Sequence, residues 1–419
     1  MAQSRRTIDG AMADGSHLKV VRYATAAEVP QEVWLQHEGP GALYGSVTWF
    51  QLAEAVGTRL SYLVVYNQPG GQAFGLLPVL LTPPRPGGSY DQVRRLLGPV
   101  LGRDLLPSVW YPTLIAGSWN SNLAVLPALP ANEVKLQRAI WNALLSEVKR
   151  IAVERGTPCI ALPFLPTDVA SVLVDLVGEQ GVFLLTTPNT LKEIRSTSFD
   201  NFVASCKRNM RKMIRRELRI FNEAGLEITI EPLQQVLEEM TELVLHSNSR
   251  HGGVTDREKI QELLMAQSQV LGDQMLSFCA RRQGRLMAAA NVVVSHQGIY
   301  GRTFGSREDR GNHMEYFALA YYAPLRYGIE HGLRWLHGGP EAYEAKLRRG
   351  FELVPLWTLF LPAAPLTSAQ RTLIRHHNEA ELERWRHWFL QITGRPAPAP
   401  WGEKGEIMRT LQQLASISG

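Results

Sequence analysis

The sequence contains little cysteine. Its 419 residues include three cysteines, Cys159, Cys206 and Cys279, which form neither a CxxC pair nor a cluster with histidine. Their wide spacing argues against a disulfide framework, and the missing clusters argue against a zinc site. We therefore expect a protein without a bound metal that works in the reducing cytoplasm.

Long apolar runs are also missing. No run of about 18 apolar residues occurs, so the sequence predicts no membrane-spanning segment and no integral membrane contact. Residues 1–17 are polar and begin with basic residues, but they lack the apolar stretch of a secretory signal. We expect these residues to be disordered.

The overall composition is that of an ordinary globular protein. Hydrophobic residues make up 45% of the chain and charged residues 20%. The length exceeds that of one typical core, which favours two domains. The formal net charge of +5 is mildly basic, so it favours an anionic partner without identifying one.

One order of secondary-structure elements occurs twice along the chain. Residues 61–82 read as a β-hairpin with a Pro-Gly-Gly turn, and residues 276–294 read as a second hairpin with a glycine in its turn. Further strands are predicted at 160–162, 183–186, 226–230 and 298–304. Asp200 is the predicted N-cap of a helix of about twenty residues, and Pro324 is expected to kink a helix at 315–332. Further helices are predicted at 133–155, 168–181, 233–248, 256–270, 367–393 and 403–417. The repeated order of helices, hairpin, strand and helix indicates two copies of one α/β unit.

Residues 206–219 are unusually basic, with seven Lys or Arg against one Glu. On a helix these cations form two neighbouring rows over about 18 Å, beside an apolar stripe. We call them the cationic strip: Lys207, Arg208, Arg211, Lys212, Arg215, Arg216 and Arg219. Like charges four residues apart cost a few tenths of a kcal/mol per pair, a cost that a bound anion would offset. The alternative is a solvated helix face whose carboxylate partners come from elsewhere in the fold.

The stretch 300–351 carries three motifs in a fixed order. They are Tyr300-Gly301-Arg302-x-x-Gly305, the pair Tyr321-Tyr322 entering a helix, and Glu344-x-Lys346-x-x-Arg349-Gly350-Phe351. In order and spacing they resemble the C-terminal acyltransferase half of a group in the GNAT superfamily. That group is related to the Fem aminoacyl transferases and is often labelled peptidoglycan biosynthesis or recognition. The resemblance implies an enzyme that moves an acyl group onto an amine.

The resemblance also implies the fold class. Fem-like proteins carry two GNAT-like units in tandem, each a mixed central sheet flanked by helices, which is an α/β (α+β) architecture. The expected division is a disordered N-terminus at 1–17, an N-terminal GNAT-like domain at 18–195, a catalytic GNAT-like domain at 196–365 and a C-terminal helical extension at 366–419.

Lys346 is the first candidate for catalysis. Its surroundings resemble the Tyr-x-x-Lys…Gly-Phe element of Fem transferases, where the lysine lies at the acyl-transfer site and neutralises developing or phosphate charge. The alternative is a surface lysine in a basic turn. Tyr321 could act as a general acid, although adjacent tyrosines commonly serve packing. The predicted substrate-binding residues are Tyr300, Arg302, Tyr316, Tyr322, Tyr343 and Arg349.

Two positions depart from the pattern of the group. Relatives commonly show His-Phe-Glu where this chain has Tyr316-Phe317-Ala318, and Glu-His-Lys where it has Glu344-Ala345-Lys346. The acceptor is therefore expected to differ from the usual cell-wall precursor. Glu315 or Glu344 could accept the proton in place of the missing histidines, if burial raised the pKa of its carboxylate. A capping or ion-pair role is the alternative for both.

The acyl donor is the remaining question. A coenzyme A site of ordinary GNAT type would show a glycine-rich pyrophosphate loop, but residues 307–313 hold one glycine and two acids. No Walker loop, GxSxG, HExxH or Rossmann motif occurs. The sequence therefore predicts an aminoacyl-tRNA donor whose acceptor stem binds the cationic strip, a small amine acceptor and no further cofactor. An N-acyltransferase using acetyl- or acyl-CoA and a non-catalytic binder of nucleic acid or an envelope precursor are the alternatives.

Overall fold

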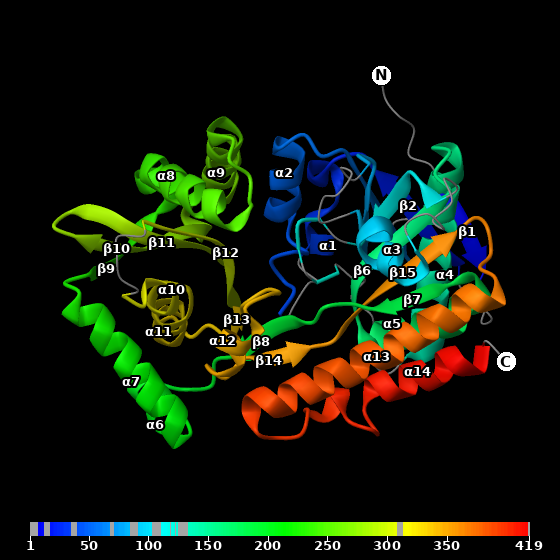
Figure 1. The fold of residues 1–419 in the computed structure, drawn as a ribbon. Helices are drawn as coiled ribbons and strands as arrows, with labels where there is room; N and C mark the ends of the chain where they lie inside the picture. The colour runs from blue at the N-terminus through cyan, green and yellow to red at the C-terminus, as the bar shows by residue number, and fades with distance from the viewer. Residues whose placement is uncertain are drawn as a thin grey trace. The chain divides into compact units, whose positions relative to one another are not determined.

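The computed structural model describes residues 7–11, 17–34, 40–67, 71–83, 91–102, 110–117, 119–121, 123–124, 133–307 and 313–417. These residues form two compact units, drawn in Figure 1. Unit 1 comprises Met1–His37, Tyr44–Asn189 and Val354–Gly419, and unit 2 comprises Glu38–Leu43 and Thr190–Leu353. Each unit holds one mixed sheet flanked by helices, so the predicted fold class is confirmed.

Unit 1 is built on an eight-stranded sheet in the order β1-β2-β3-β4-β5-β6-β15-β7. Neighbouring strands run antiparallel except β5 and β6, which are parallel. The predicted hairpin at 61–82 is confirmed as β3 and β4. The strands are β1 (Thr7–Ala11), β2 (His17–Tyr23), β3 (Leu60–Tyr66), β4 (Ala73–Leu80), β5 (Thr113–Ala116), β6 (Cys159–Pro166), β7 (Val182–Leu185) and β15 (Leu356–Pro362).

The helices of unit 1 follow the apolar periodicity of their sequences. In α4 the side chains at Ile140, Leu144, Val148 and Ile151 recur at three and four residues and are all buried. The helices are α1 (Gln31–Trp34), α2 (Val47–Ala55), α3 (Gly98–Leu101), α4 (Val134–Glu154), α5 (Thr167–Val177), α13 (Ser368–Thr393) and α14 (Glu406–Ile417). None of the helices in the described ranges is long and apolar enough to cross a membrane.

Two expectations for the chain ends differ from the structure. Residues 7–11 lie in the segment predicted to be disordered, yet they form β1, which pairs antiparallel with β2 from Thr7↔Val21 to Ala11↔His17. Strand β15 was expected in the catalytic domain at 196–365, but it lies between β6 and β7 in the sheet of unit 1. The reason is apolar burial, because Leu356–Leu361 are buried on both faces and require a central position in a sheet.

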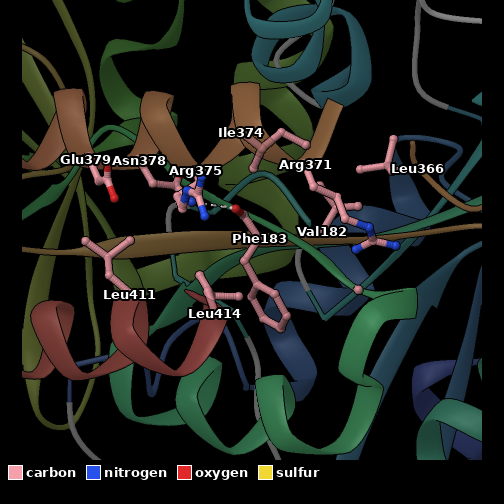
Figure 2. Close-up of a pocket in the computed structure, with 11 residues that line it drawn as sticks. Val182, Phe183, Leu366, Arg371, Ile374, Arg375, Asn378, Glu379, Leu411 and Leu414 are labelled. Carbon is pink, nitrogen blue, oxygen red and sulfur yellow. Dashed lines mark hydrogen bonds between the residues drawn. The ribbon is translucent and has the colours of Figure 1, made fainter. Parts of the chain in front are cut away.

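Helix α13 covers the open edge of the sheet in unit 1. The Asn378 amide accepts a hydrogen bond from Leu185 N at 2.8 Å and donates one to Phe183 O at 2.9 Å, and so takes the place of a further strand beside β7. A small cavity of about 50 Å³ adjoins this contact between β7, α13 and α14 (Figure 2). Two residues that line it, Arg371 and Asn378, donate hydrogen bonds to backbone carbonyls of unit 1. We therefore interpret the cavity as part of the packing of α13 against the edge of the sheet.

Unit 2 is built on a seven-stranded sheet in the order β14-β8-β13-β12-β11-β10-β9. Strands β12 and β13 pair in parallel, whereas β9 with β10, β10 with β11, β11 with β12 and β8 with β13 pair antiparallel. The predicted second hairpin is confirmed as β10 and β11. The strands are β8 (Asn189–Glu193), β9 (Glu227–Pro232), β10 (Met275–Arg282), β11 (Arg285–Val294), β12 (Gly298–Ser306), β13 (Trp335–His337) and β14 (Glu352–Val354).

Helices α8 and α9 agree with the predicted ranges, whereas α12 was not predicted and the segment around Asp200 differs from the prediction. The expected single helix after Asp200 is two helices, because Cys206 and Lys207 take extended ψ angles of 149° and 151°. The N-cap is Ser198, whose hydroxyl accepts from Asn201 N. The helices are α6 (Phe199–Ser205), α7 (Arg208–Glu223), α8 (Leu233–His251), α9 (Arg257–Leu271), α10 (Glu315–Phe317), α11 (Ala323–Glu330) and α12 (Tyr343–Leu347).

The interruption expected at Pro324 has a definite form. A π-helical turn at Ala318–Tyr322 joins α10 to α11, and Pro324 lies in the first turn of α11. A π-helical turn is one way in which a helix accommodates a break in its hydrogen-bond ladder. Both Tyr321 and Tyr322 belong to this turn and are buried.

Candidate functional site

The site forms where β12 and β13 stop pairing. Their parallel ladder ends at Tyr300↔His337, while β12 continues to Ser306 along β11. Tyr300 therefore lies within β12, which continues beyond it to Ser306. Both side chains are buried, and their ring centroids are 5.5 Å apart. The Tyr300 hydroxyl accepts a hydrogen bond from Leu43 N at 3.4 Å.

A tight loop connects β13 to α12. Gly339, Glu341 and Ala342 have φ angles of 71°, 64° and 44°, and two of these residues carry side chains that disfavour positive φ. A Cβ atom on Gly338 would lie 2.6 Å from Thr190 Oγ1, so the loop approaches β8 more closely than a side chain permits. Residues in such conformations are held by their surroundings and are frequent at functional sites.

Lys346 lies in α12, directly after this loop, and is 3% exposed. Its Nζ donates to Gly339 O at 3.1 Å and to Pro340 O at 2.7 Å. Burial lowers the pKa of Lys346 to about 8, against the opposing influence of Glu341. The alternative interpretation, in which Lys346 is a surface lysine in a basic turn, is therefore wrong. An ammonium group has three donors, so Lys346 keeps one N–H for a further acceptor beyond the two carbonyls.

His337 is a member of the site that sequence reasoning missed. Burial lowers its pKa to about 3, with additional lowering by the charges of Arg302 and Lys346. The imidazole is therefore neutral at physiological pH, and two cations lie near it. The sequence signal that could have identified this residue is its place at the end of a short apolar strand directly before Gly338-Gly339.

Arg349 and Tyr322 were predicted to bind substrate, but the structure joins them to a third side chain. Arg349 Nη2 lies 2.5 Å from Glu217 Oε1, and its Nε donates to the Tyr322 hydroxyl at 3.0 Å. The Tyr322 hydroxyl donates to the other oxygen of Glu217. The guanidinium also stacks on Phe317, with 3.6 Å between its carbon and the ring centroid. A substrate contact through Arg349 would have to compete with these buried partners.

Tyr316 and Tyr321 form a neighbouring pair. Their hydroxyl oxygens are 2.8 Å apart, and their rings meet edge to face at 5.3 Å. Burial raises the pKa of both hydroxyls, and the raised pKa of Tyr321 also reflects the contact with Tyr316. Both tyrosines therefore stay protonated and can donate a proton or a hydrogen bond at neutral pH.

Neither of the two predicted proton acceptors is fully buried. The Glu344 side chain is 53% exposed and pairs with Arg348 at 2.7 Å, so it lacks the burial on which the prediction depended. Glu315 is half-buried at the first position of α10. Tyr343 is half-buried at the first position of α12. Among the described residues of unit 2, the buried carboxylate is instead that of Glu217, which the sequence marked by its place on the apolar face between Ile214 and Phe221.

A second buried lysine adjoins the loop. Lys192 of β8 is 8% exposed, donates to Gly350 O at 3.3 Å and lies 4.5 Å from the Phe202 ring centroid. Burial lowers the pKa of Lys192 to about 8, while Cys206 and Glu352 oppose the shift. A Cβ on Gly350, where φ is 80°, would lie 3.0 Å from Lys192 Nζ, so glycine is required there.

The cationic strip occupies the outer face of α7 and the residue before it. Its members are exposed except Arg211, which is half-buried and donates to Ala204 O at 2.8 Å. Within the described residues, Arg219 is the one member with a carboxylate partner, Glu223 at 3.7 Å. The carboxylates expected from elsewhere under the alternative interpretation are therefore not found there. As far as the structure describes the chain, six of the seven cations of the strip have no carboxylate partner.

Across the described ranges, His, Cys, Asp and Glu side chains do not gather in threes as a metal site requires. The segment 307–313 that stands where a coenzyme A loop would lie is described only at its ends, so residues 308–312 fall outside the described part of the chain.

Comparison with known proteins agrees with this arrangement. Residues 110–392 match the model of the FemAB-like family, which is described as peptidoglycan biosynthesis/recognition. No curated protein matches the chain.

The solved structures that resemble the chain share little sequence with it. The crystal structure of FemX has 12% identity and a TM-score of 0.55, covering 84% of this chain and 99% of FemX. A tandem GNAT protein from the clavulanic acid biosynthesis pathway has 14% identity and a TM-score of 0.47, covering 84% of this chain and 100% of that one. The C-terminal domain of a putative lysylphosphatidylglycerol synthetase from Agrobacterium fabrum has 10% identity and a TM-score of 0.48, covering 84% and 94%. At such identities the likeness to FemX concerns the fold.

Proposed function

The chain belongs to the FemAB-like family, and from this premise we propose that it is an aminoacyltransferase that takes its acyl group from aminoacyl-tRNA. The product is an amide between the amino acid and the amine of a small molecule or cell-envelope precursor. The observation that carries the proposal is the buried Lys346, whose Nζ is held by two carbonyls with one donor left over. No cofactor beyond the donor is needed, because the tRNA ester is already activated, and we place the reaction in the cytoplasm.

The chemistry requires a positioned donor for developing charge. A neutral amine attacks the ester carbonyl, the new C–N bond forms, and the tetrahedral oxygen gains negative charge. In this proposal the remaining N–H of Lys346 binds that oxygen. The C–O ester bond then breaks, the amine proton passes to an acceptor for which Glu315 is the candidate, and the tRNA oxygen leaves with a proton from Tyr321.

The cationic strip supports a polyanionic donor. Seven cations along α7 and its N-cap have one carboxylate partner in the described part of the chain, so a nucleic-acid backbone would meet little competition. Each phosphate that a Lys or Arg neutralises releases condensed counterions, which makes binding salt-dependent. Coenzyme A carries fewer phosphates than such a strip could bind, which is why the acyl-CoA reaction ranks second.

Binding measurements with both donors test the proposal. Total tRNA is titrated onto the full chain by filter binding across a salt series, and coenzyme A is titrated by calorimetry. The proposal expects micromolar, salt-sensitive tRNA binding without heat from coenzyme A. Coenzyme A binding with negligible tRNA binding would reject the tRNA donor in favour of an acyl-CoA N-acyltransferase. Tight tRNA binding without transfer of labelled amino acid to any amine would indicate a binding protein.

A further inference from the structure

Glu217 is the one acid among residues 206–219, which carry the cationic strip, and it lies on the opposite, buried face of the helix. Six strip members are exposed, whereas Glu217 is 8% exposed on the inner face of α7, level with the buried Ile214 and Phe221. Its two oxygens bind Arg349 and Tyr322. The buried face of α7 is thus bonded through Glu217 to Arg349, which follows Lys346 in the chain.

Arg349 distributes its donors over three elements. Its Nη2 binds Glu217 of α7, its Nε binds the Tyr322 hydroxyl of the π-helical turn, and its Nη1 donates to Ala345 O in α12 at 2.7 Å. The backbone N–H of Arg349 also donates to Lys346 O at 2.9 Å. Because the guanidinium is planar and rigid, this arrangement fixes α12 relative to α7 in direction as well as in distance.

Stability alone is a poor reason for such an ion pair. Desolvation of two charges offsets most of their attraction, and apolar side chains of similar size are often as stabilising. Apolar contacts between α7 and the core of unit 2 are already supplied by Ile214 and Phe221. What a buried, directional pair adds is a unique register between the elements that it joins.

We propose that Glu217 is a positioning residue, which through Arg349 holds the α12 turn so that Lys346 Nζ keeps its place on the Gly339 and Pro340 carbonyls, in register with the cationic strip. This role deepens the proposed function, since it relates the donor-binding helix to the group that stabilises the transfer. The positioning role of Glu217 can also be tested in the free protein, without any acyl donor. Removal of the Glu217 charge releases Lys346 toward solvent.

The test measures the reactivity of the Lys346 amine. Trace acetylation with acetic anhydride over pH 6–11, read by mass spectrometry of the peptide that contains Lys346, gives the pH midpoint of its labelling. Glu217→Gln keeps the size of the side chain and removes its charge. Glu223→Gln makes the same change at an exposed position of the same helix and is the matched control. We expect Glu217→Gln to raise the midpoint by at least about half a pH unit and Glu223→Gln to leave it unchanged.

The outcomes separate this inference from the proposed function. An unchanged Lys346 profile in a cooperatively folded Glu217→Gln protein overturns the positioning role. If Glu217→Gln does not fold, the double variant Glu217→Met/Arg349→Met removes both charges together, and a wild-type Lys346 profile in that variant overturns the proposal. A raised midpoint in a protein that neither binds tRNA nor transfers amino acids upholds the positioning role and rejects the tRNA donor. With active enzyme, kcat should fall at least tenfold while KM for the tRNA stays the same.

Discussion

Thr190 and Lys346 donate to the same carbonyl oxygen. Thr190 Oγ1 lies 2.5 Å and Lys346 Nζ lies 3.1 Å from Gly339 O, which also accepts from Thr190 N at 3.2 Å. Thr190 begins the long segment of unit 2 and Lys346 lies near the end of that segment, so residues far apart in the chain hold one peptide group of the strained loop. This shared acceptor fixes the lysine through carbonyl oxygens, and no ion pair with a carboxylate of the described residues neutralises its charge.

Lys346→Met should abolish most of the transfer activity. Removal of a preorganised donor at a developing oxyanion typically lowers turnover about 100- to 1,000-fold. Methionine fills the buried space, so the melting temperature should change by a few degrees at most. Turnover of labelled aminoacyl-tRNA and thermal unfolding measure the two effects, with Lys259→Met at an exposed position as the control. Loss of folding in Lys346→Met, with activity retained per folded molecule, would make the lysine structural.

Lys212→Gln with Arg215→Gln should weaken donor binding and flatten its dependence on salt. Both side chains are exposed, and neither is tied to a carboxylate in the described part of the chain, so the change leaves the fold intact. Each lost phosphate contact on a duplex lowers the slope of log K against log salt by about 0.9. Filter binding with tRNA at several salt concentrations measures this slope. Arg375→Gln, an exposed arginine on α13 of unit 1, should keep the wild-type slope.

Lys192→Met should change how stability depends on pH. The folded pKa of Lys192 is about 8, below its value of 10.5 in the unfolded chain, so the unfolded state holds more protons between those pH values. The free energy of unfolding of the wild type therefore rises with pH across this window, by up to about 1.4 kcal/mol per pH unit from this one group. Lys192→Met lacks that contribution, and Lys346 contributes equally to both proteins. Urea unfolding at pH 7.5, 8.5 and 9.5 should show that the free energy of unfolding of the wild type rises relative to that of the variant. A difference that stays constant with pH would contradict the buried ammonium.

Asn378→Leu should destabilise unit 1. It leaves Leu185 N and Phe183 O without their partner at the covered edge of β7, and each buried unsatisfied group costs about 1–3 kcal/mol. We expect a loss of about 3 kcal/mol in the free energy of unfolding. Asn142→Leu on the exposed face of α4 makes the same chemical change without a buried partner and should stay within about 0.5 kcal/mol of the wild type. Equal effects of the two substitutions would mean that Asn378 does not cover the edge.

Local pattern predicted most of the elements, because helix and strand periodicity are properties of neighbouring residues. The hairpins β3–β4 and β10–β11 and the helix α4 follow apolar spacing and glycine-containing turns. The break between α6 and α7 was missed, because no proline or glycine marks Cys206-Lys207. For the site, the motif around Lys346 and the cationic strip could be predicted from the sequence, because each is a continuous run of residues with a recognisable order.

By itself, then, the sequence determined the family, the two-unit α/β architecture and the presence of a cationic helix, since these depend on residues close together in the chain. Only the tertiary structure decided which charges are buried. Glu217 and Arg349 are 132 residues apart in the chain, and Lys192 meets Gly350 across 158 residues. Strand β15 returns to the sheet of unit 1 from the far end of the sequence. Such pairings depend on how whole elements pack, and burial, rather than residue type, is what lowers the pKa of a lysine and gives Arg349 its partners Glu217 and Tyr322.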